Sequence, residues 1–275
     1  MISLFPDLPR PLLFAHRGAS RHAPENTLDA FELGLKLGAH VLEMDAHMTK
    51  DGELVVLHDA TLERTTDGHG LVRDKSFAEL RELDAGFHFA LGGGLFPFRG
   101  QACAVPRLAD VFAAFPRAGF NIELKQEQPS LVRPMLDLLE RVGNRNVLLT
   151  AANDRIMAEL EAAKPGCGLG LSLNQVTQVL KATYFSSKIG DLQGRALQIP
   201  LRHERLVFGL VPITTRWVIR TAHADGLEVH LFTLDAPTIA KKWLDHGVDG
   251  VMSNDPGALA GLFPRNSGQV GGSGA

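Results

Sequence analysis

Two apolar segments of the sequence carry charged residues at alternate positions. Glu43 and Asp45 form an E-x-D pair, and Glu123 and Lys125 form an E-x-K pair. In an extended strand, residues two apart point to the same face of the sheet. Each pair is therefore expected to project from its strand as a unit. If both strands end at the same face of a barrel, three carboxylates converge near its mouth.

Three carboxylates in one pocket repel each other, and either protonation or a bound cation must relieve that repulsion. A lone carboxylate at a strand end is often simply solvated, but two charged pairs on two apolar strands favour a cation site. A set of ligands that are all oxygen selects a hard ion. We therefore expect one divalent cation, Mg²⁺ or Ca²⁺, held by Glu43, Asp45 and Glu123.

Two of the eleven histidines, His16 and His58, end apolar runs and are followed by a charged residue. Near a cation, two imidazoles can supply a general base and a general acid that both work close to neutral pH. Arg17 would add a bidentate fork and Lys125 a point charge for an oxyanion. This set suits an anionic phosphate ester, because positive charge stabilises the charge that develops on phosphoryl oxygens.

Short apolar segments alternate with amphipathic segments along the 275 residues. We expect strands at 12–16, 41–45, 54–58, 120–125, 147–150, 169–173, 196–200, 227–234 and 250–253. We expect helices at 26–38, 107–115, 130–142, 153–163, 174–184, 214–225 and 237–246. Repeated strand-then-helix order implies a parallel sheet with crossover helices. About eight such units favour an α/β fold of the TIM (β/α)₈ barrel type over an open doubly wound sheet.

The segment from about 61 to 104 interrupts this alternation. It is rich in Gly, Asp and Arg and contains three consecutive glycines at 92–94. It is longer than a plain strand-to-helix loop, so we expect an inserted lid or subdomain after the second strand. Residues 1–265 are expected to form a single barrel domain, and the Gly- and Ser-rich residues 266–275 a flexible tail.

Composition and charge narrow the classes of partner. The net charge of −3 and the pI near 6.4 give no basic footprint for nucleic acid. The sequence begins without a basic and apolar leader, no apolar run is long enough to cross a bilayer, and two cysteines make no disulfide framework. We therefore expect a cytoplasmic protein.

The apolar stretch 202–212 favours core packing, while a dimer contact or a peripheral membrane contact stays open. The sequence does not indicate the oligomeric state.

At these residues the sequence resembles the glycerophosphodiester phosphodiesterase family. Any one of the matching tripeptides is a weak signal, but the set occurs in the family's order over residues 11–258. The matching pieces are His16-Arg17-Gly18, Pro24-Glu25-Asn26-Thr27, Glu43-x-Asp45, His58-Asp59, Glu123-x-Lys125 and Gly247-Val248-Asp249-Gly250-Val251.

The resemblance implies a TIM barrel that hydrolyses glycerophosphodiesters to glycerol 3-phosphate and an alcohol such as choline or ethanolamine. It also implies roles for the residues already singled out. The ligands of one divalent cation would be Glu43, Asp45 and Glu123, the acid/base pair would be His16 and His58, and the phosphate would lie on Arg17 and Lys125. Of the two histidines, the first is favoured as the acid and the second as the base.

Three rival functions stay open beside this one. A lysophospholipase D would use the same site on long-chain lysolipids. A glycoside hydrolase also uses paired carboxylates on a barrel, but it gives no reason for two strand-end histidines. A barrel that lost catalysis and only binds would lack a ligand, and all three carboxylates are present.

The sequence departs from the family's pattern near its seventh barrel strand. Phe232 stands where the family often has tryptophan, so it can keep an apolar wall for the substrate but loses the indole N–H donor. Asp235 puts a carboxylate where an amide is usual, which puts substrate fit there in doubt. At the start of the first helix, we expect Asn26 and Thr27 to act as caps.

Overall fold

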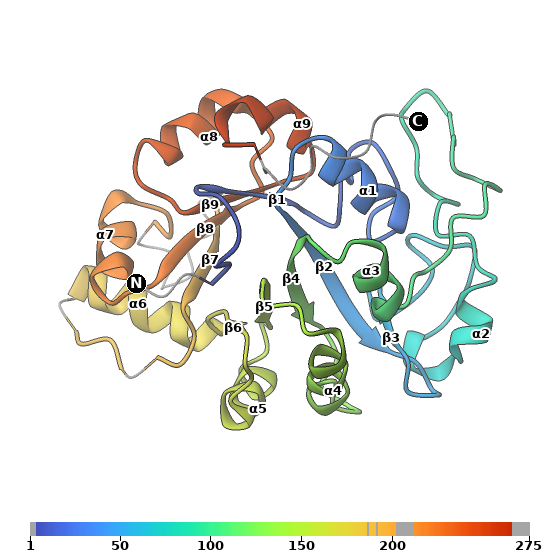
Figure 1. Ribbon diagram of the computed structural model, residues 1–275, viewed down its shortest axis with the longest axis horizontal. Coiled ribbons are helices and arrows are strands. Elements are labelled where there is room, and N and C mark those ends of the chain that lie inside the picture. Colours follow the sequence, from blue (N-terminus) through green and yellow to red (C-terminus); the bar gives the residue numbers. More distant parts are fainter. Residues whose placement is uncertain (1–3, 186, 191, 202–211, 266–275) are drawn as a thin grey trace.

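Eight parallel strands form a nearly closed barrel in the computed structural model, which describes residues 4–185, 187–190, 192–201 and 212–265 (Figure 1). The strands are β1 (Leu12–Ala15), β2 (Val41–Met48), β4 (Gly119–Leu124), β5 (Val147–Thr150), β6 (Gly168–Leu169), β7 (Ala196–Pro200), β8 (Glu228–Phe232) and β9 (Gly250–Ser253). Their order is β6-β5-β4-β2-β1-β9-β8-β7, and a parallel bridge between Gly170 and Ala196 joins the two ends of that row. The predicted (β/α)₈ barrel is confirmed.

Helices surround the strands in the order that the crossover pattern requires (Figure 1). They are α1 (Leu28–Lys36), α3 (Leu108–Ala114), α4 (Val132–Val142), α5 (Asp154–Ala163), α6 (Leu173–Phe185), α7 (Arg216–Ala224), α8 (Pro237–Leu244) and α9 (Pro256–Leu259), followed by the short 3₁₀ helix η2 (Ala260–Leu262). Alternation along β2 sends Leu42 and Met44 outward into the apolar layer that includes Phe31 of α1 and Phe112 of α3. Glu43 and Asp45 consequently face the barrel interior.

An apolar cluster lies in the interior at the amino ends of the strands, where the chain that precedes β1 covers it. Phe5 is fully buried there, and its ring packs edge-on against Phe14 at 5.8 Å between centroids. Leu12, Leu148 and Met252 complete this cluster. The carboxyl ends of the strands therefore offer the mouth at which polar side chains of the interior meet solvent.

The insertion predicted after the second strand, at about 61–104, lies within the segment between β2 and α3, on the right of Figure 1. The segment begins with β3 (Leu54–Val56), which pairs antiparallel with β2, and contains η1 (Val72–Asp74) and α2 (Phe77–Leu80). A separate apolar cluster holds it together. Its buried members are Val55, Leu57, Leu62, Val72, Leu80, Ala85, Cys103 and Val105.

The strand expected at 169–173 departs furthest from its predicted bounds, because only Gly168–Leu169 is extended. Ser172 ends it by starting α6: its backbone N–H donates to Gln175 Oε1 at 2.9 Å, and its hydroxyl accepts from the Gln175 backbone N–H at 3.4 Å. This reciprocal pair is a capping box. The apolar stretch expected at 202–212 lies, except for Pro212, outside the described residues, as does the tail 266–275. Among the described helices, none is both long and apolar enough to cross a membrane.

Candidate active site

Three carboxylates meet at the mouth of the barrel. Glu43 and Asp45 of β2 and Glu123 of β4 each offer an oxygen atom, and these atoms lie within 4.8 Å of one another. The parallel register that sets Asp45 opposite Glu123 brings the two strands' carboxylates together. Glu43 and Asp45 are 4% and 1% exposed, whereas Glu123 is only partly buried. The structure thus brings together the three residues that the sequence singled out as ligands.

The charge balance of this acidic cluster fits a bound cation. Burial, and then the charge of Asp45, raise the pKa of Glu43 well above its ordinary value. Lys125 Nζ lies 3.2 Å from Asp45 Oδ1 and 3.0 Å from Glu123 Oε2. Although burial opposes it, these two carboxylates raise the pKa of Lys125. A hard divalent cation would relieve the remaining repulsion with the oxygen ligands that it prefers.

Arg17 contributes both its backbone and its side chain to the cluster. Its backbone N–H donates to Glu43 Oε2 at 2.8 Å, from a left-handed conformation with a φ of 54°. Its Nε is buried 3.3 Å from Asp45 Oδ2 and makes no hydrogen bond to any described residue. A buried, charged donor without a hydrogen bond is costly in a folded chain. It suits a site that receives an anionic ligand.

Asn26 supports the cluster instead of capping the first helix. Its side-chain amide donates to Asp45 Oδ2 at 2.9 Å, and its backbone is left-handed with a φ of 60°. Thr27 is the N-cap, and its hydroxyl accepts from the Ala30 backbone N–H at 3.3 Å. The prediction of two caps was therefore right for Thr27 and wrong for Asn26. Asparagine tolerates the left-handed region, which turns its side chain from the helix towards β2.

His16 follows β1 and faces the acidic cluster. Its Nδ1 lies 2.7 Å from Asn254 Oδ1, and its Nε2 lies 3.9 Å from Glu43 Oε2. An amide oxygen only accepts hydrogen bonds, so Nδ1 carries the proton and a neutral His16 presents the Nε2 lone pair to the cluster. Burial lowers the pKa of His16, although its hydrogen bond with Asn254 opposes this, and the charge of Arg17 lowers it further.

The Asn254 amide is itself held in one orientation. Ser20 Oγ donates to its Oδ1 at 3.0 Å, and its Nδ2 donates to Asp235 Oδ2 at 3.3 Å. Asp235 Oδ1 also accepts from Ser253 Oγ and from the Asn254 backbone N–H, both at 2.8 Å. The carboxylate that replaces the family's usual amide therefore bonds the end of β9. Phe232, at the end of β8, is partly buried against the apolar interior cluster.

His58 reaches the mouth from the insertion. The antiparallel pairing of β3 with β2 extends to a hydrogen bond from the Leu57 backbone N–H to Asp45 O at 3.0 Å, so Leu57 lies opposite Asp45 and His58 is the next residue along the chain. Its Nδ1 lies 2.5 Å from Asp59 Oδ1. Although burial opposes it, hydrogen bonds from Arg64 and His58 lower the pKa of Asp59 to about 2. His58 thus has an ionised carboxylate as its partner, whereas His16 has a neutral amide.

The sequence did not assign roles in the site to several supporting residues. Glu25 was noted only within a segment that matches the family, Arg64 follows no strand, and Asn254 directly follows the last strand but was given no role. The supporting residues found in the structure are Ser20, Glu25, Asn26, Asp59, Arg64, Asp235 and Asn254. Arg17, which is predicted to bind the phosphate, contacts this group directly: its Nη1 donates to Glu25 Oε1 at 3.0 Å, and its backbone oxygen accepts from the Asn26 backbone N–H at 3.0 Å.

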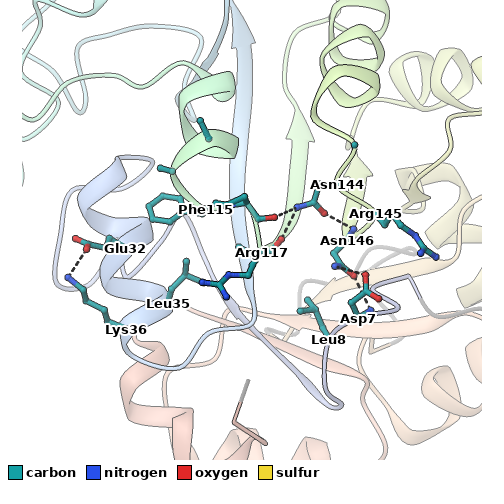
Figure 2. Close-up of a pocket in the computed structure, with 15 residues that line it drawn as sticks. Asp7, Leu8, Glu32, Leu35, Lys36, Phe115, Arg117, Asn144, Arg145 and Asn146 are labelled. Carbon is teal, nitrogen blue, oxygen red and sulfur yellow. Dashed lines mark hydrogen bonds and ion pairs between the residues drawn. The ribbon is translucent and has the colours of Figure 1, made fainter. Parts of the chain in front are cut away.

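A hollow of about 1220 Å³ lies at the other end of the barrel, where the loops before β4 and β5 meet α1 and α3 (Figure 2). Its polar contacts stabilise loops: Asn144 donates to the backbone oxygens of Pro116 and Ala118, both at 3.2 Å. The Glu32–Lys36 ion pair lies on the exposed side of α1. Nothing among its described lining residues resembles the acidic cluster, so the chemistry belongs to the mouth.

A (β/α)₈ barrel with carboxylates, imidazoles and cations gathered at the carboxyl ends of its strands defines a class of protein, the barrel hydrolases of anionic esters. Comparison with known proteins gives the family. Residues 16–258 match the Glycerophosphoryl diester phosphodiesterase family. The chain belongs to that family and is a phosphoric diester hydrolase.

Individual relatives agree with this assignment. The glycerophosphodiester phosphodiesterase of Caldanaerobacter subterraneus subsp. tengcongensis is 29% identical over 263 residues, which cover 93% of this chain and 99% of that protein. Lysophospholipase D GDPD1 of Homo sapiens is 26% identical over 89% of this chain and 83% of its own length. An Oleispira antarctica phosphodiesterase, solved in complex with the product sn-glycerol-3-phosphate, has 26% identity, covers 92% of this chain and 96% of its own, and superposes with a TM-score of 0.71.

Proposed function

We propose that the protein hydrolyses glycerophosphodiesters to glycerol 3-phosphate and an alcohol, with one divalent cation and two histidines. The observation that carries this proposal is the meeting of three carboxylate oxygens within 4.8 Å, with His16 Nε2 3.9 Å from one of the three residues. Glu43, Asp45 and Glu123 would hold the cation. When bound, the cation supplies positive charge for the phosphate oxygens.

The two histidines divide acid and base work according to their partners. His16 is the general base, because a neutral amide holds its Nδ1–H and burial lowers its pKa, which leaves the Nε2 lone pair available. His58 is the second imidazole of the site and takes the role of general acid, with Asp59 holding its Nδ1. This assignment reverses the order favoured from the sequence, which had no information on the partners.

Arg17 and Lys125 bind the phosphate. Arg17 Nε is a buried donor that lies 3.3 Å from Asp45 Oδ2 without a hydrogen bond to any described residue, and Lys125 Nζ lies between Asp45 and Glu123. Both charges are fixed before substrate arrives, so they stabilise charge that develops on phosphoryl oxygens without reorganisation. Phe232 forms an apolar wall at the end of β8.

His16 removes the proton from the nucleophile, which is either water or the 2-hydroxyl of the substrate's glycerol. Attack by that hydroxyl produces a cyclic phosphate first, and attack by water gives glycerol 3-phosphate directly. His58 donates its proton to the oxygen of the departing alcohol. Phosphorus-31 spectra recorded during turnover distinguish the two routes, because only the first accumulates a cyclic ester.

A substrate panel tests the proposal. Glycerophosphocholine, glycerophosphoethanolamine and lysophosphatidylcholine are assayed with EDTA and after readdition of Mg²⁺ or Ca²⁺. Hydrolysis of the first two that stops in EDTA and returns with one ion supports the proposal. Because a relative is named a lysophospholipase D, preferential turnover of the lysolipid would move the assignment to that substrate class. Full activity in EDTA would remove the cation from the mechanism.

A further inference from the structure

Arg64 connects the two loops that carry catalytic side chains. It lies in the insertion between β3 and η1. Its Nη1 donates to Glu25 Oε2 at 2.8 Å, its Nη2 donates to Glu25 Oε1 at 2.7 Å, and its Nε donates to Asp59 Oδ2. One planar guanidinium thus binds a carboxylate from the loop after β1 and another from the loop after β3.

Each of these carboxylates makes a second contact with a residue of the proposed site. Glu25 Oε1 accepts from Arg17 Nη1 at 3.0 Å, and Asp59 Oδ1 contacts His58 Nδ1 at 2.5 Å. The contacts form one continuous chain from Arg17 through Glu25, Arg64 and Asp59 to His58. The phosphate-binding arginine and the general acid therefore share a single support.

We infer that Arg64 is a positioning residue, which fixes His58 through Asp59 and Arg17 through Glu25, so that acid and phosphate are held at one separation. The inference rests on the proposed function. Asp59 holds His58 Nδ1 and so orients the ring, and Arg64 holds the second oxygen of Asp59. A lysine carries its three donors on one nitrogen atom and lacks the planar fork that gives Glu25 two parallel bonds and Asp59 a third.

The exposure of Arg64 separates this role from one in folding. Its side chain is 46% exposed, and exposed ion pairs contribute little to the stability of a fold. Ordering the Arg64 side chain costs conformational entropy, and its exposed ion pairs return little stability to the fold. Its expected effect is on turnover, because a small misplacement of a catalytic group can slow a reaction about 100-fold.

The adjoining space offers a direct test by chemical rescue. A hollow of about 290 Å³ beside the site is lined by Arg64, Glu25, Ser20 and His88. In Arg64→Ala, free guanidinium at millimolar concentration can enter from this side and bind the same two carboxylates. A residue that acts only by stabilising the insertion would give no saturable rescue.

The experiment compares Arg64→Ala and Arg64→Lys with wild type on two substrates, glycerophosphocholine and the p-nitrophenyl ester of glycerol 3-phosphate. We expect kcat for the choline ester to fall about 10- to 100-fold in Arg64→Ala, with a smaller rise in KM because Arg17 also loses its support through Glu25. The p-nitrophenyl ester should lose less, because its leaving group departs without a proton from His58. Arg64→Lys should be intermediate, and guanidinium should restore Arg64→Ala on the choline ester.

Arg99→Ala is the matched control, since Arg99 belongs to the same insertion and binds the Phe87 backbone oxygen at 2.8 Å and the Phe87 and Phe96 rings. It should keep wild-type kcat. Wild-type kcat in Arg64→Ala, an equal loss on both esters without rescue, or the same loss in Arg99→Ala would each overturn the inference. Absence of turnover in the wild type would instead overturn the proposed function. Failure of the proposed function can therefore be distinguished from failure of the inference about Arg64.

Discussion

The barrel buries one glutamate at each end of its interior, and the two are equally hidden but oppositely balanced. Glu43 and Glu228 are both 4% exposed. At the amino end, Glu228 accepts from both terminal nitrogens of Arg10 at 2.6 and 2.8 Å and from the Leu4 backbone N–H at 3.2 Å, and lies 3.3 Å from His230 Nε2. Although burial opposes it, His230 and Arg10 lower its pKa to about 2.

At the carboxyl end, the buried glutamate is Glu43, and negative charges outnumber positive charges around it. Burial and the neighbouring Asp45 raise the pKa of Glu43, and Arg17 Nε makes no hydrogen bond to the described residues around it. Burial of a charge therefore does not by itself mark a functional site. What distinguishes a functional site is a buried charge that the chain itself does not neutralise. Such a charge destabilises the free protein, and a bound ligand removes that destabilisation.

The largest expected effect is on activity at the carboxyl end. Glu43→Gln removes a proposed ligand and should lower kcat/KM at least about 1,000-fold. Because the variant also removes buried repulsion, its free energy of unfolding in EDTA should equal or exceed that of the wild type. Steady-state kinetics and urea unfolding measure the two quantities, and a variant that is both active and destabilised would erase the contrast between the two ends.

The converse substitution at the amino end should act on stability. Glu228→Gln replaces the bidentate, charge-assisted pair with the partly exposed Arg10 by a weaker neutral contact, which should cost about 2 kcal/mol of unfolding free energy. The folded fraction should keep its kcat, because Glu228 lies at the end of the barrel remote from the mouth. Urea unfolding combined with kinetics at low temperature checks this, and a loss of kcat without a loss of stability would contradict it.

Cation binding should sharpen the comparison further. A ligand that binds only the folded state at about 100 times its Kd stabilises it by about 2.7 kcal/mol. Mg²⁺ or Ca²⁺ should therefore raise the Tm of the wild type and of Glu228→Gln, but not that of Glu43→Gln. An equal rise in all three proteins would indicate a cation site elsewhere.

The two ends should also respond to pH with opposite sign, and this is the smallest effect. The folded pKa of Glu228 is below its ordinary value of 4.5, so its contribution is present above about pH 4.5 and is lost as the pH falls towards 2. The folded pKa of Glu43 is raised, so without cation its contribution is present below about pH 4.5 and declines as the pH rises. Tm profiles in EDTA, compared with each glutamine variant, separate the two slopes.

The local sequence pattern was sufficient to predict those features that depend on a single strand or on the order of strands and helices. The alternation of Glu43 and Asp45 along β2 predicted that both point inward, and the strand-then-helix order predicted the barrel. The acidic cluster followed from these two facts, because parallel strands end at one face. The distances between the three carboxylate oxygens, all within 4.8 Å, could not be predicted, because they depend on the register of β2 with β4.

Sequence reasoning missed contacts that join distant segments. His16 and Asn254 are 238 residues apart and meet because β1 and β9 are neighbours in the barrel. Asn26 was assigned to a cap because its type and position fit one, whereas a left-handed backbone sends its amide to Asp45. The partners of these side chains are set by how distant strands and loops pack together. A single sequence does not reveal that packing.

The pairing of β3 with β2 has a consequence for exchanging parts between family members. The backbone bond from Leu57 to Asp45 makes the entry of the insertion a continuation of the sheet, and the proposed acid follows directly at His58. A chimaera whose junction falls before this point would import a foreign acid together with its loop. A junction placed after Arg64 would instead transplant only the outer part and keep the catalytic framework of the host.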